Sequence, residues 1–352
     1  MALLSLPLVH ARSIPAPRRA LAGDLTSLPP SPAHRPAWPG RQITAGGVTL
    51  HVRETAGEPD VPGSGWSGPG EVAVEAVYVH GLSGSATNWT DLTGLLAPRA
   101  RGVAVDLPGF GYSEPLPSCD YTPAAHADAL LCWLAGRGRP VHLVGNSLGG
   151  IVAMLVAARR PELIRTLTLV SPAMPDRRPD PRRMSDPRMA MAWLPGRLGS
   201  RARAGLAGMT ARERAESVVG LCFGDPSRAT DARLDETAAE IAARGGQPWA
   251  AQAIDRSALG LFRSWAGPQL WRTAARVPVP TLVVWGDRDR LVSPKLAERT
   301  TRTLPDARLL MLPGVGHIAQ IEVPQLVAAA VGAFWDRVTD GKMETDERVG
   351  AH

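Results

Sequence analysis

Ser147 stands in a sequence context that is typical of a nucleophile. The segment Gly145–Gly149 reads Gly-Asn-Ser-Leu-Gly and lies between the apolar runs Val141–Val144 and Ile151–Ala158. A G-x-S-x-G pattern between a strand and a helix predicts a sharp turn that exposes the serine hydroxyl above a sheet, with the helix N-terminus beneath it. The flanking glycines fit this turn, because a side chain at either position would collide with the neighbouring strand or helix. The alternative is a glycine-rich turn whose serine is incidental.

His317 is the best candidate for the base that such a serine requires. A serine hydroxyl is a poor nucleophile at neutral pH unless a base takes its proton and a third group orients that base. Of the eight histidines, only His317 and His80 stand directly after predicted parallel strands. His317 follows the last strand on the glycine-rich segment Leu312–Gly316, which can carry an imidazole over the sheet edge. We interpret His80 as a structural residue that holds its own loop.

Two aspartates compete for the orienting role. Asp287 and Asp289 both follow the apolar segment Thr281–Trp285, where a buried carboxylate could accept a hydrogen bond from the imidazole. Aspartate is also common in turns and helix caps, so either residue could have a purely local role. The chain order Ser, Asp, His is the one expected for a G-x-S-x-G nucleophile. The residues themselves leave the choice open, with a slight preference for Asp289.

Backbone N–H groups are the expected donors to an oxyanion that forms at the serine. Leu148 directly follows Ser147 and would supply one of them. A second donor is expected from a loop after an early strand. The segment His80–Gly84 fits this position, with the N–H of Leu82 as our choice.

Short apolar strands alternate with helices along most of the chain. A hairpin is predicted over Ile43–Arg53, followed by the strands Val72–Val79, Val103–Val105, Val141–Val144, Leu167–Val170, Thr281–Trp285 and Leu309–Leu312. Helices are predicted over Pro123–Ala135, Ile151–Ala158, Pro294–Thr303 and Pro324–Val338. This alternation predicts an α/β fold with a mostly parallel central sheet that helices cover on both faces.

The alternation is interrupted between Ala173 and Val277, where no strand is predicted. Helices are expected there over Pro187–Leu194, Ala211–Cys222, Asp231–Arg244 and Pro248–Trp271. We therefore divide the chain into a Pro-rich leader with little regular structure (1–40), a core (41–172 and 278–340), an inserted all-helical domain (173–277) and a flexible tail (341–352).

Composition and charge exclude several classes of protein. The 352 residues carry a formal net charge of +6, but no basic block interleaved with aromatics predicts a nucleic-acid partner. The three cysteines lie far apart without C-x-x-C spacing, which argues against a zinc site or a disulfide framework and favours a reducing, cytoplasmic location: Cys119, Cys132 and Cys222. No apolar run approaches the roughly 18 residues of a membrane span. The first residues lack the basic n-region of a signal peptide.

Five motifs, in this order along the chain, are similar to those of the α/β-hydrolase fold family. They are His80-Gly81, Asp106–Ser113, Gly145–Gly150, Gly286-x-x-Asp289, and Gly316-His317 followed by Glu322 and Pro324. The resemblance extends over residues 41–338. It implies the family's fold, with the insertion 173–277 as a cap that roofs the site and selects substrates.

The resemblance also implies roles for individual residues. Ser147, Asp289 and His317 would form a catalytic triad, with Asp289 favoured by the G-x-x-D pattern. Family members similar to epoxide hydrolases and haloalkane dehalogenases carry an aspartate in place of the serine, which argues against those chemistries. The form Gly-Asn-Ser-x-Gly-Gly resembles the branch with carbon–carbon bond hydrolases, although the loop after His80 lacks the fuller pattern of that branch.

We therefore expect a serine hydrolase that cleaves a carboxylic ester or a related acyl bond of a small molecule, without a cofactor or a metal. The same residues would serve acyl transfer, thioester or lactone hydrolysis, amide cleavage, carbon–carbon bond hydrolysis or cofactor-free perhydrolase chemistry. A ligand receptor on a hydrolase scaffold is the alternative of another class. Trp and Met residues of the insertion would line an apolar pocket or form the insertion's own core: Met184, Met189, Met191, Trp193, Met209, Trp249, Trp265 and Trp271. The oligomeric state stays open.

Overall fold

A nine-stranded sheet runs through the computed structural model, which describes residues 9–10, 35–55, 74–116, 118, 120–176, 201, 205 and 208–339. Its strands are β1 (Val9–His10), β2 (Gly40–Ala45), β3 (Val48–Glu54), β4 (Glu75–Val79), β5 (Arg101–Val105), β6 (Val141–Asn146), β7 (Ile164–Val170), β8 (Thr281–Gly286) and β9 (Ala307–Leu312). The order across the sheet is β1-β9-β8-β7-β6-β4-β5-β3-β2. All neighbours from β9 to β5 are parallel, which confirms the predicted mostly parallel sheet.

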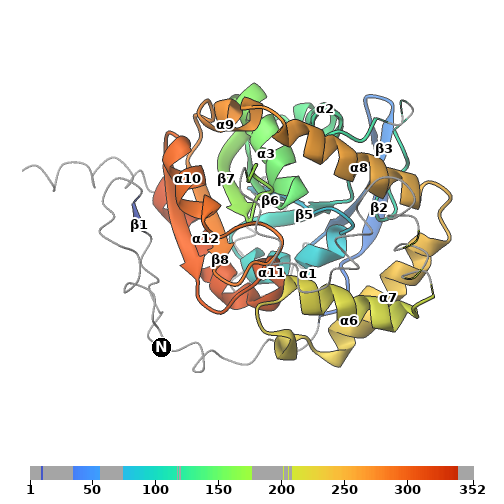
Figure 1. Cartoon of the computed structure of the whole chain (residues 1–352). Coiled ribbons are helices and arrows are strands. Elements are labelled where there is room, and N and C mark those ends of the chain that lie inside the picture. Colours follow the sequence, from blue (N-terminus) through green and yellow to red (C-terminus); the bar gives the residue numbers. More distant parts are fainter. Residues whose placement is uncertain are drawn as a thin grey trace, which may run out of the picture.

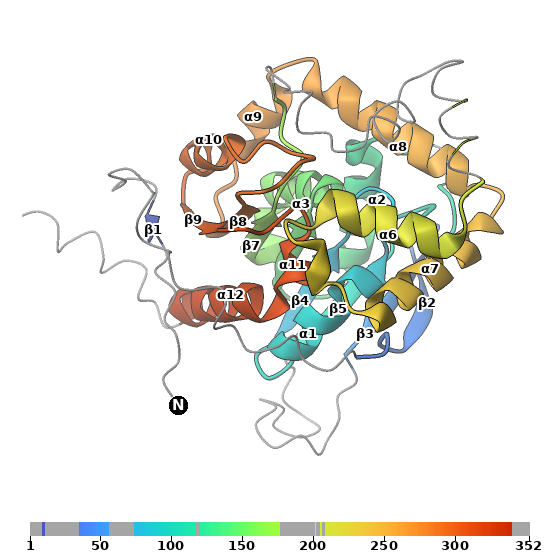
Figure 2. The ribbon, with the colours of Figure 1, turned by 60° about the horizontal axis from the view of Figure 1, so that its bottom comes forward.

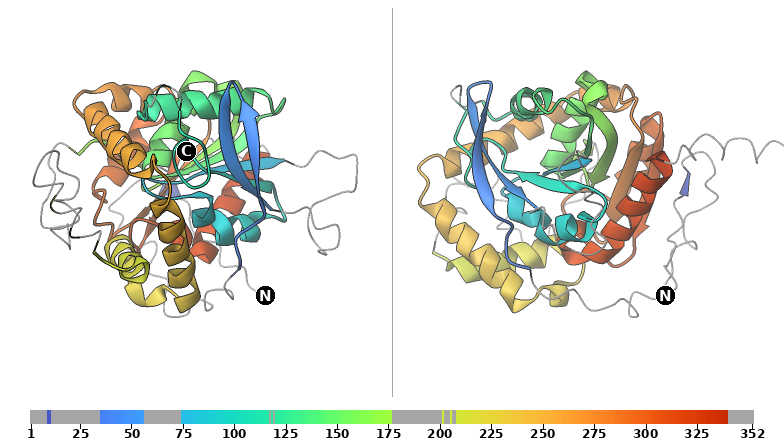
Figure 3. Two further views of the ribbon diagram at one scale, coloured as in Figure 1. Left: turned by 90° about the vertical axis from the view of Figure 1, so that its right-hand side faces the viewer. Right: turned by 180° about the vertical axis from the view of Figure 1, so that it is seen from behind.

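Antiparallel pairs lie at both edges of the sheet. β2 and β3 form the predicted hairpin, and β3 pairs with β5. The hairpin turn uses Gly46 and Gly47 at φ of 58° and 77°, the left-handed region that glycine adopts readily. At the opposite edge β1 pairs with β9. Figure 3 shows the hairpin in blue on the side of the sheet away from the red C-terminal elements.

Helices cover both faces of the sheet, as predicted. α2 (Pro123–Ala135), α3 (Leu148–Arg159) and α10 (Leu296–Thr303) share one apolar core, which receives Val77 and Val79 of β4. α1 (Thr90–Leu96) and α12 (Pro324–Thr339) share the other core, which receives the alternate residues Ala76 and Tyr78. Figure 1 shows α2 and α3 on one side of the strands and α1 and α12 on the other. Because both faces are buried, β6 and β8 are buried at every position.

A helical segment stands between β7 and β8. It contains α6 (Ala211–Cys222), α7 (Asp231–Gly245), α8 (Ala250–Trp265) and α9 (Gln269–Ala274). The predicted bounds of α6 are correct, because Thr210 caps it and Glu213 completes a capping box. α6 and α7 pack side by side (Figure 2). Between positions 173 and 277, every element among the described residues is a helix.

One predicted helix of this segment is in fact two. The prediction of a continuous helix over Pro248–Trp271 is wrong, because α8 ends at Trp265 and α9 begins at Gln269. Pro268 lies in the break, where its missing N–H and its effect on the preceding residue interrupt a helix. The predicted helix Pro187–Leu194 lies outside the described residues.

Two short helices were not predicted, α1 and α11 (Ala319–Glu322). Both are too short for a clear apolar period. α1 follows a 3-10 turn over Ala86–Trp89 that Ser85 caps. In the part of the chain that the structure describes, no helix combines the length and the apolar character that crossing a bilayer requires.

Acidification is expected to destabilise this fold through three buried histidines. Burial lowers the pKa of His80 to about 4 and the pKa of both His126 and His142 to about 3, whereas the unfolded value is about 6.5. Below about pH 6.5 the unfolded chain therefore binds protons that the folded chain does not, and the free energy of unfolding decreases as the pH falls toward about 4. Each histidine contributes a slope of up to about 1.4 kcal/mol per pH unit in this window.

Urea unfolding at pH 7.5, 6.0 and 5.0 measures this slope. His126→Asn removes one of the titrating groups, so its slope should be shallower than that of the unmodified protein. Equal slopes for the two proteins would contradict a neutral buried His126.

Candidate active site

Ser147 occupies the sharp turn between β6 and α3. Its backbone has φ 54° and ψ −115°, a conformation that residues with a side chain rarely adopt. The serine N–H donates to the carbonyl oxygen of Val170 on β7 at 3.1 Å, which fixes the turn against the sheet. The side chain is partly exposed, whereas the residues on both sides are buried. The sharp strand-to-helix turn that the sequence predicts is therefore present at Ser147.

The glycines around Ser147 are required by close backbone contacts. A Cβ at Gly145 would lie 2.4 Å from the carbonyl oxygen of Gly149. A Cβ at Gly149 would lie 2.3 Å from the carbonyl oxygen of Val79. Neither backbone group could move without displacing a strand or the first turn of α3. The predicted steric reason for the G-x-S-x-G pattern is confirmed.

The turn lies where the strand order reverses. β4 is flanked by β5 on one side and by β6 on the other, so the loops after β4 and β6 diverge from the same edge of the sheet. Open α/β sheets bind their ligands outside the carboxyl ends of the strands at such a point. The loop after β4 contacts the serine directly, because a Cβ at Gly81 would lie 3.2 Å from Cβ of Ser147.

The two predicted oxyanion donors, the N–H groups of Leu82 and Leu148, lie next in sequence to Gly81 and Ser147. Leu148 is the first residue of α3, where an N–H has no acceptor within its own helix. Leu82 directly follows Gly81, and its N–H donates to no protein acceptor among the described residues. The structure thus brings Leu82, Leu148 and Ser147 together, and within the described part of the chain neither N–H group has a backbone partner.

His317 and Asp289 form a buried pair. Nδ1 of His317 lies 2.8 Å from Oδ2 of Asp289, and both residues are buried. The other carboxylate oxygen, Oδ1, accepts the N–H groups of Leu291 and Val292 at 2.9 Å each. Because the carboxylate accepts from Nδ1–H, the imidazole keeps Nε2 as its free acceptor. A histidine in this state can take a proton from a hydroxyl.

Asp287 has a different partner. It is exposed, and its Oδ1 accepts the N–H of Gly314 at 2.7 Å. The contact tethers the loop that carries His317 without reaching the imidazole. Of the two aspartates that the sequence left open, the structure pairs Asp289 with His317.

Asn146 links the serine turn to the histidine loop. Its Nδ2 donates to the carbonyl oxygen of Val170 at 3.0 Å and to that of His317 at 3.2 Å. Among the described residues, the hydroxyl of Ser147 makes no hydrogen bond to the imidazole. Such contacts in unliganded sites are often long and tighten only when substrate binds.

Glu322 organises the histidine loop, a role that sequence reasoning missed. Its buried carboxylate accepts four donors: the N–H of Gly224 at 2.9 Å, of Asp225 at 3.0 Å and of Gly316 at 2.7 Å, and Nη1 of Arg228 at 2.7 Å. Two of the backbone donors and Arg228 belong to the segment after α6, so Glu322 ties the helical insertion to the loop of His317. A carboxylate in the apolar run Ile321–Val323 was the signal that could have found it.

Glu322→Gln is expected to lower the free energy of unfolding by about 2–3 kcal/mol, because an amide cannot neutralise Arg228 and turns an N–H donor toward other N–H donors. Urea unfolding measures the loss. Glu298→Gln is the matched control, since Glu298 pairs with Arg302 on the surface of α10 and such pairs contribute about 0–1 kcal/mol. Equal losses in the two variants would contradict the organising role of Glu322.

Cys222 lies beside the histidine, and its carbonyl oxygen accepts the N–H of His317 at 2.7 Å. Burial, with the nearby charges of Asp289 and Glu322, raises the pKa of its thiol to about 12. The thiol is therefore protonated at neutral pH and is a poor nucleophile.

His80 holds the loop after β4, as the sequence suggested. Its Nε2 accepts the N–H of Leu107 at 3.0 Å, so Nδ1–H donates to the carbonyl oxygen of Gly81 at 2.7 Å. Asp106 shapes the neighbouring turn by accepting the N–H groups of Ala86 at 2.6 Å and Tyr112 at 2.9 Å. His80 and Asp106 therefore hold the backbone of the loops next to the site.

The tryptophans of the insertion have specific contacts. Nε1 of Trp265 donates to the carbonyl oxygen of Ala173 at 2.8 Å, and the N–H of Ala173 donates to the carbonyl oxygen of Ser147 at 3.1 Å. α8 is thus connected to the serine turn. The ring of Trp271 stacks under the guanidinium of Arg299, with 3.9 Å between the guanidinium carbon and the ring centroid, a packing role at the α9–α10 contact. Met184, Met189, Met191 and Trp193 lie outside the described residues.

The described residues offer no group of three or more His, Cys, Asp or Glu side chains that could hold a metal ion. The site combines a serine on a strained turn, an imidazole oriented by a buried carboxylate, and backbone N–H groups beside the serine.

Comparison with known proteins defines the class. The family model for the alpha/beta hydrolase fold matches residues 77–324, and the chain belongs to this family. It is similar to Lipase 3 of Moraxella sp. (strain TA144), with 26% identity over 269 residues that cover 74% of this chain and 76% of the relative. It is also similar to the dihydrolipoyllysine-residue acetyltransferase component of the acetoin cleaving system of Pseudomonas putida, with 27% identity over 274 residues that cover 75% of this chain and 64% of the relative.

A solved structure shares the fold. The 2-hydroxy-6-oxo-6-phenylhexa-2,4-dienoate hydrolase from Rhodococcus sp. strain RHA1 superposes with a TM-score of 0.65 at 20% identity, over 84% of this chain and 98% of that one. The family and the lipase relative support a hydrolase.

Proposed function

We propose that the protein is a serine hydrolase that cleaves a carboxylic ester or a related acyl bond of a small molecule. The observation that carries this proposal is the buried pair of His317 and Asp289, with 2.8 Å between Nδ1 and Oδ2. Asn146, next to Ser147, donates a hydrogen bond to the backbone carbonyl of His317 and so links the two loops. An oriented imidazole beside a serine on a strained turn is the arrangement that activates a hydroxyl for attack on a carbonyl.

In the first step, Oγ of Ser147 forms a bond to the carbonyl carbon while Nε2 of His317 takes the hydroxyl proton. Asp289 fixes the tautomer of the imidazole and stabilises its charged form. The N–H groups of Leu82 and Leu148 bind the oxyanion. When the tetrahedral intermediate collapses, the bond to the alkoxide breaks and His317 returns the proton to that leaving group.

In the second step, water attacks the acyl-enzyme. His317 takes a proton from the water, a second tetrahedral intermediate forms in the same oxyanion site, and its collapse releases the carboxylic acid and restores the hydroxyl of Ser147. The cycle is complete without a cofactor.

We propose that residues 173–277 act as a cap over this site. The support comes from Cys222 at the end of α6, whose carbonyl oxygen accepts the N–H of His317, and from Ala173, which links Trp265 of α8 to the carbonyl oxygen of Ser147. The tail over 341–352 belongs to the same proposal. The leader over 1–40 is kept only as a boundary, because it contains β1, which pairs with β9, and its last residue Gly40 begins β2. The two cysteines among the described residues, Cys132 and Cys222, are free thiols, which fits the cytoplasmic location that we propose.

Hydrolysis of p-nitrophenyl esters of increasing acyl length, from acetate to laurate, tests the proposal. We expect turnover that depends on Ser147 and a chain-length optimum set by the insertion. Tight ligand binding without turnover of any ester, thioester or lactone would contradict it and favour a receptor.

Acyl transfer is the second candidate, because one relative is an acetyltransferase component. The same acyl-enzyme would then react with an alcohol, amine or thiol in place of water. Product analysis with such nucleophiles present separates the two: a transferred acyl group that exceeds the free acid at modest acceptor concentration favours the transferase.

A further inference from the structure

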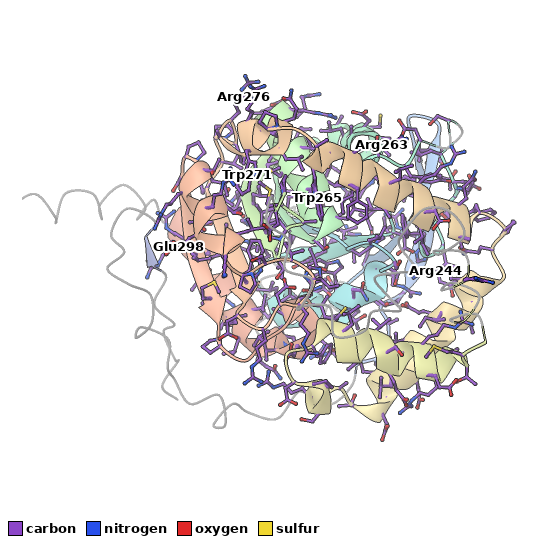
Figure 4. The ribbon with its side chains drawn as sticks, viewed as in Figure 1. Arg244, Arg263, Trp265, Trp271, Arg276 and Glu298 are labelled. Atoms are coloured by element: carbon purple, nitrogen blue, oxygen red, sulfur yellow. The ribbon has the colours of Figure 1, made fainter. Side chains whose placement is uncertain are left out.

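Helix α7 of the insertion holds the loop after β4 with two side chains. Nη1 of Arg244 donates to the carbonyl oxygen of Ser83 at 2.5 Å, and Nη2 donates to that of Gly84 at 3.3 Å. One turn earlier on α7, the carboxylate of Glu240 accepts the hydroxyl of Ser85 at 3.0 Å. Figure 4 shows Arg244 near the end of α7. The contacts join residues about 160 positions apart in the sequence, from the insertion to the loop beside Ser147.

The loop has a backbone that needs such support. Ser83 has a φ of 62°, which is unfavourable for a residue with a side chain. The following N–H, of Gly84, donates back to the carbonyl oxygen of Gly81 at 3.0 Å and closes a tight turn. A Cβ at Gly84 would lie 2.2 Å from Oδ1 of Asn88 and 3.2 Å from the carbonyl oxygen of Gly81, so the turn packs closely against both residues.

Two peptide planes connect Arg244 to the N–H of Leu82. The carbonyl of Ser83 and the N–H of Gly84 belong to one planar peptide unit, so a guanidinium that holds the carbonyl also orients the N–H. That N–H donates to the carbonyl of Gly81, which also accepts Nδ1–H of His80 at 2.7 Å and belongs to the same planar unit as the N–H of Leu82. In a trans peptide the C=O and the N–H point in opposite directions. The hydrogen bonds that hold the carbonyl of Gly81 therefore also fix the direction of the Leu82 N–H.

The same series of hydrogen bonds increases the donor strength of the Leu82 N–H. A charged guanidinium polarises the carbonyl that it binds, and hydrogen bonds in series polarise one another. The positive charge of Arg244 therefore makes Gly84 N–H a better donor to Gly81, which in turn makes Leu82 N–H a better donor to negative charge.

A direct contact between Arg244 and the acyl group does not fit the space around it. The cavity next to the guanidinium is about 10 Å³ and is lined by Ser85, Asp106, Glu240 and Gln247. This is the space of about one water molecule. Nε of Arg244 and Oε1 of Gln247 are buried and have no partner among the residues that the structure describes, so a single bridging water is the occupant that suits this cavity.

We propose that Arg244 is a positioning residue that sets the direction and the donor strength of the Leu82 N–H through the Ser83–Gly84 and Gly81–Leu82 peptide units. This inference rests on the proposed function, because the donor matters only if an oxyanion forms at Ser147. The insertion would then contribute to the rate of the reaction itself as well as to the choice of substrate.

Arg244→Met and Arg244→Lys test the inference, with Arg263→Met on the exposed face of α8 as the matched control. Loss of a direct oxyanion donor costs about 10²–10³-fold in kcat, so misalignment of one should cost about 10–100-fold. We expect this loss in kcat for Arg244→Met with KM changed less than about threefold, an equal loss in the rate of fluorophosphonate labelling, and an unchanged pH profile of kcat/KM. Arg244→Lys keeps the charge and one contact, and its kcat should be about tenfold higher than that of Arg244→Met.

Hydrogen exchange of peptides that cover residues 81–86 provides a readout that does not depend on turnover. Exchange should be faster in Arg244→Met than in the unmodified protein and in Arg263→Met. If Arg244→Met matches Arg263→Met in kcat and in labelling rate while the unmodified protein is active, the inference is overturned and the proposed function stands. If the unmodified protein neither reacts with the probe nor turns over any acyl substrate, the proposed function fails and the inference fails with it.

Discussion

Ser147→Ala is expected to lower kcat/KM for an ester substrate by about 10⁶-fold, because no other group in the site can form the acyl-enzyme. The methyl side chain keeps the Cβ and the backbone of the turn at φ 54°. The protein should therefore fold normally, and its melting temperature should change by less than about 2 °C. Steady-state kinetics, with circular dichroism as the folding control, measures both quantities.

Retained turnover in a folded Ser147→Ala protein would contradict the proposed mechanism. The residual rate must be separated from traces of other esterases, so the variant is best purified in parallel with Ser217→Ala. The hydroxyl of Ser217 donates to the carbonyl oxygen of Glu213 within α6. It has no place in the proposed chemistry.

Asp289→Asn and Asp287→Asn are expected to differ by about three orders of magnitude in kcat. An amide at position 289 cannot stabilise the imidazolium and favours the wrong tautomer of His317, which costs about 10⁴-fold. At position 287 an asparagine Oδ1 can still accept the N–H of Gly314, so the loss should stay below about tenfold. The two changes remove the same charge two residues apart, and each is the control of the other.

The same kinetic assay decides between the two aspartates. Similar and mild losses in both variants would mean that neither carboxylate orients the base. A large loss only in Asp287→Asn would reverse the assignment that the contacts favour.

The arrangement around Ser147 could be predicted because it depends on local sequence. A glycine on each side of the serine, an apolar strand before it and an apolar helix after it are all within 20 residues, and each has a steric reason. The strands and the main helices follow from the same local patterns. The break between α8 and α9 was predictable as well, since Gly267-Pro268 marks it in the sequence.

The remaining features depend on contacts between distant residues. Asp287 and Asp289 have the same chemistry and nearly the same position. The resemblance to the family favoured Asp289, and the different directions of the two carboxylates separate them in the structure. Glu322 gathers donors from Gly224 and Arg228, more than 90 positions away. Arg244 meets Ser83 across 161 positions. No periodicity or motif reports such pairs, because they arise when the insertion packs onto the sheet.

The identity of the nucleophile is the central claim, and covalent labelling tests it most directly. The purified protein is treated with a fluorophosphonate probe and digested, and the modified residue is located by mass spectrometry, with Ser147→Ala as the control. We predict a single adduct on Oγ of Ser147 and none in the variant. An adduct on another residue that abolishes ester turnover, or full turnover with Ser147 unmodified, would contradict the proposed mechanism.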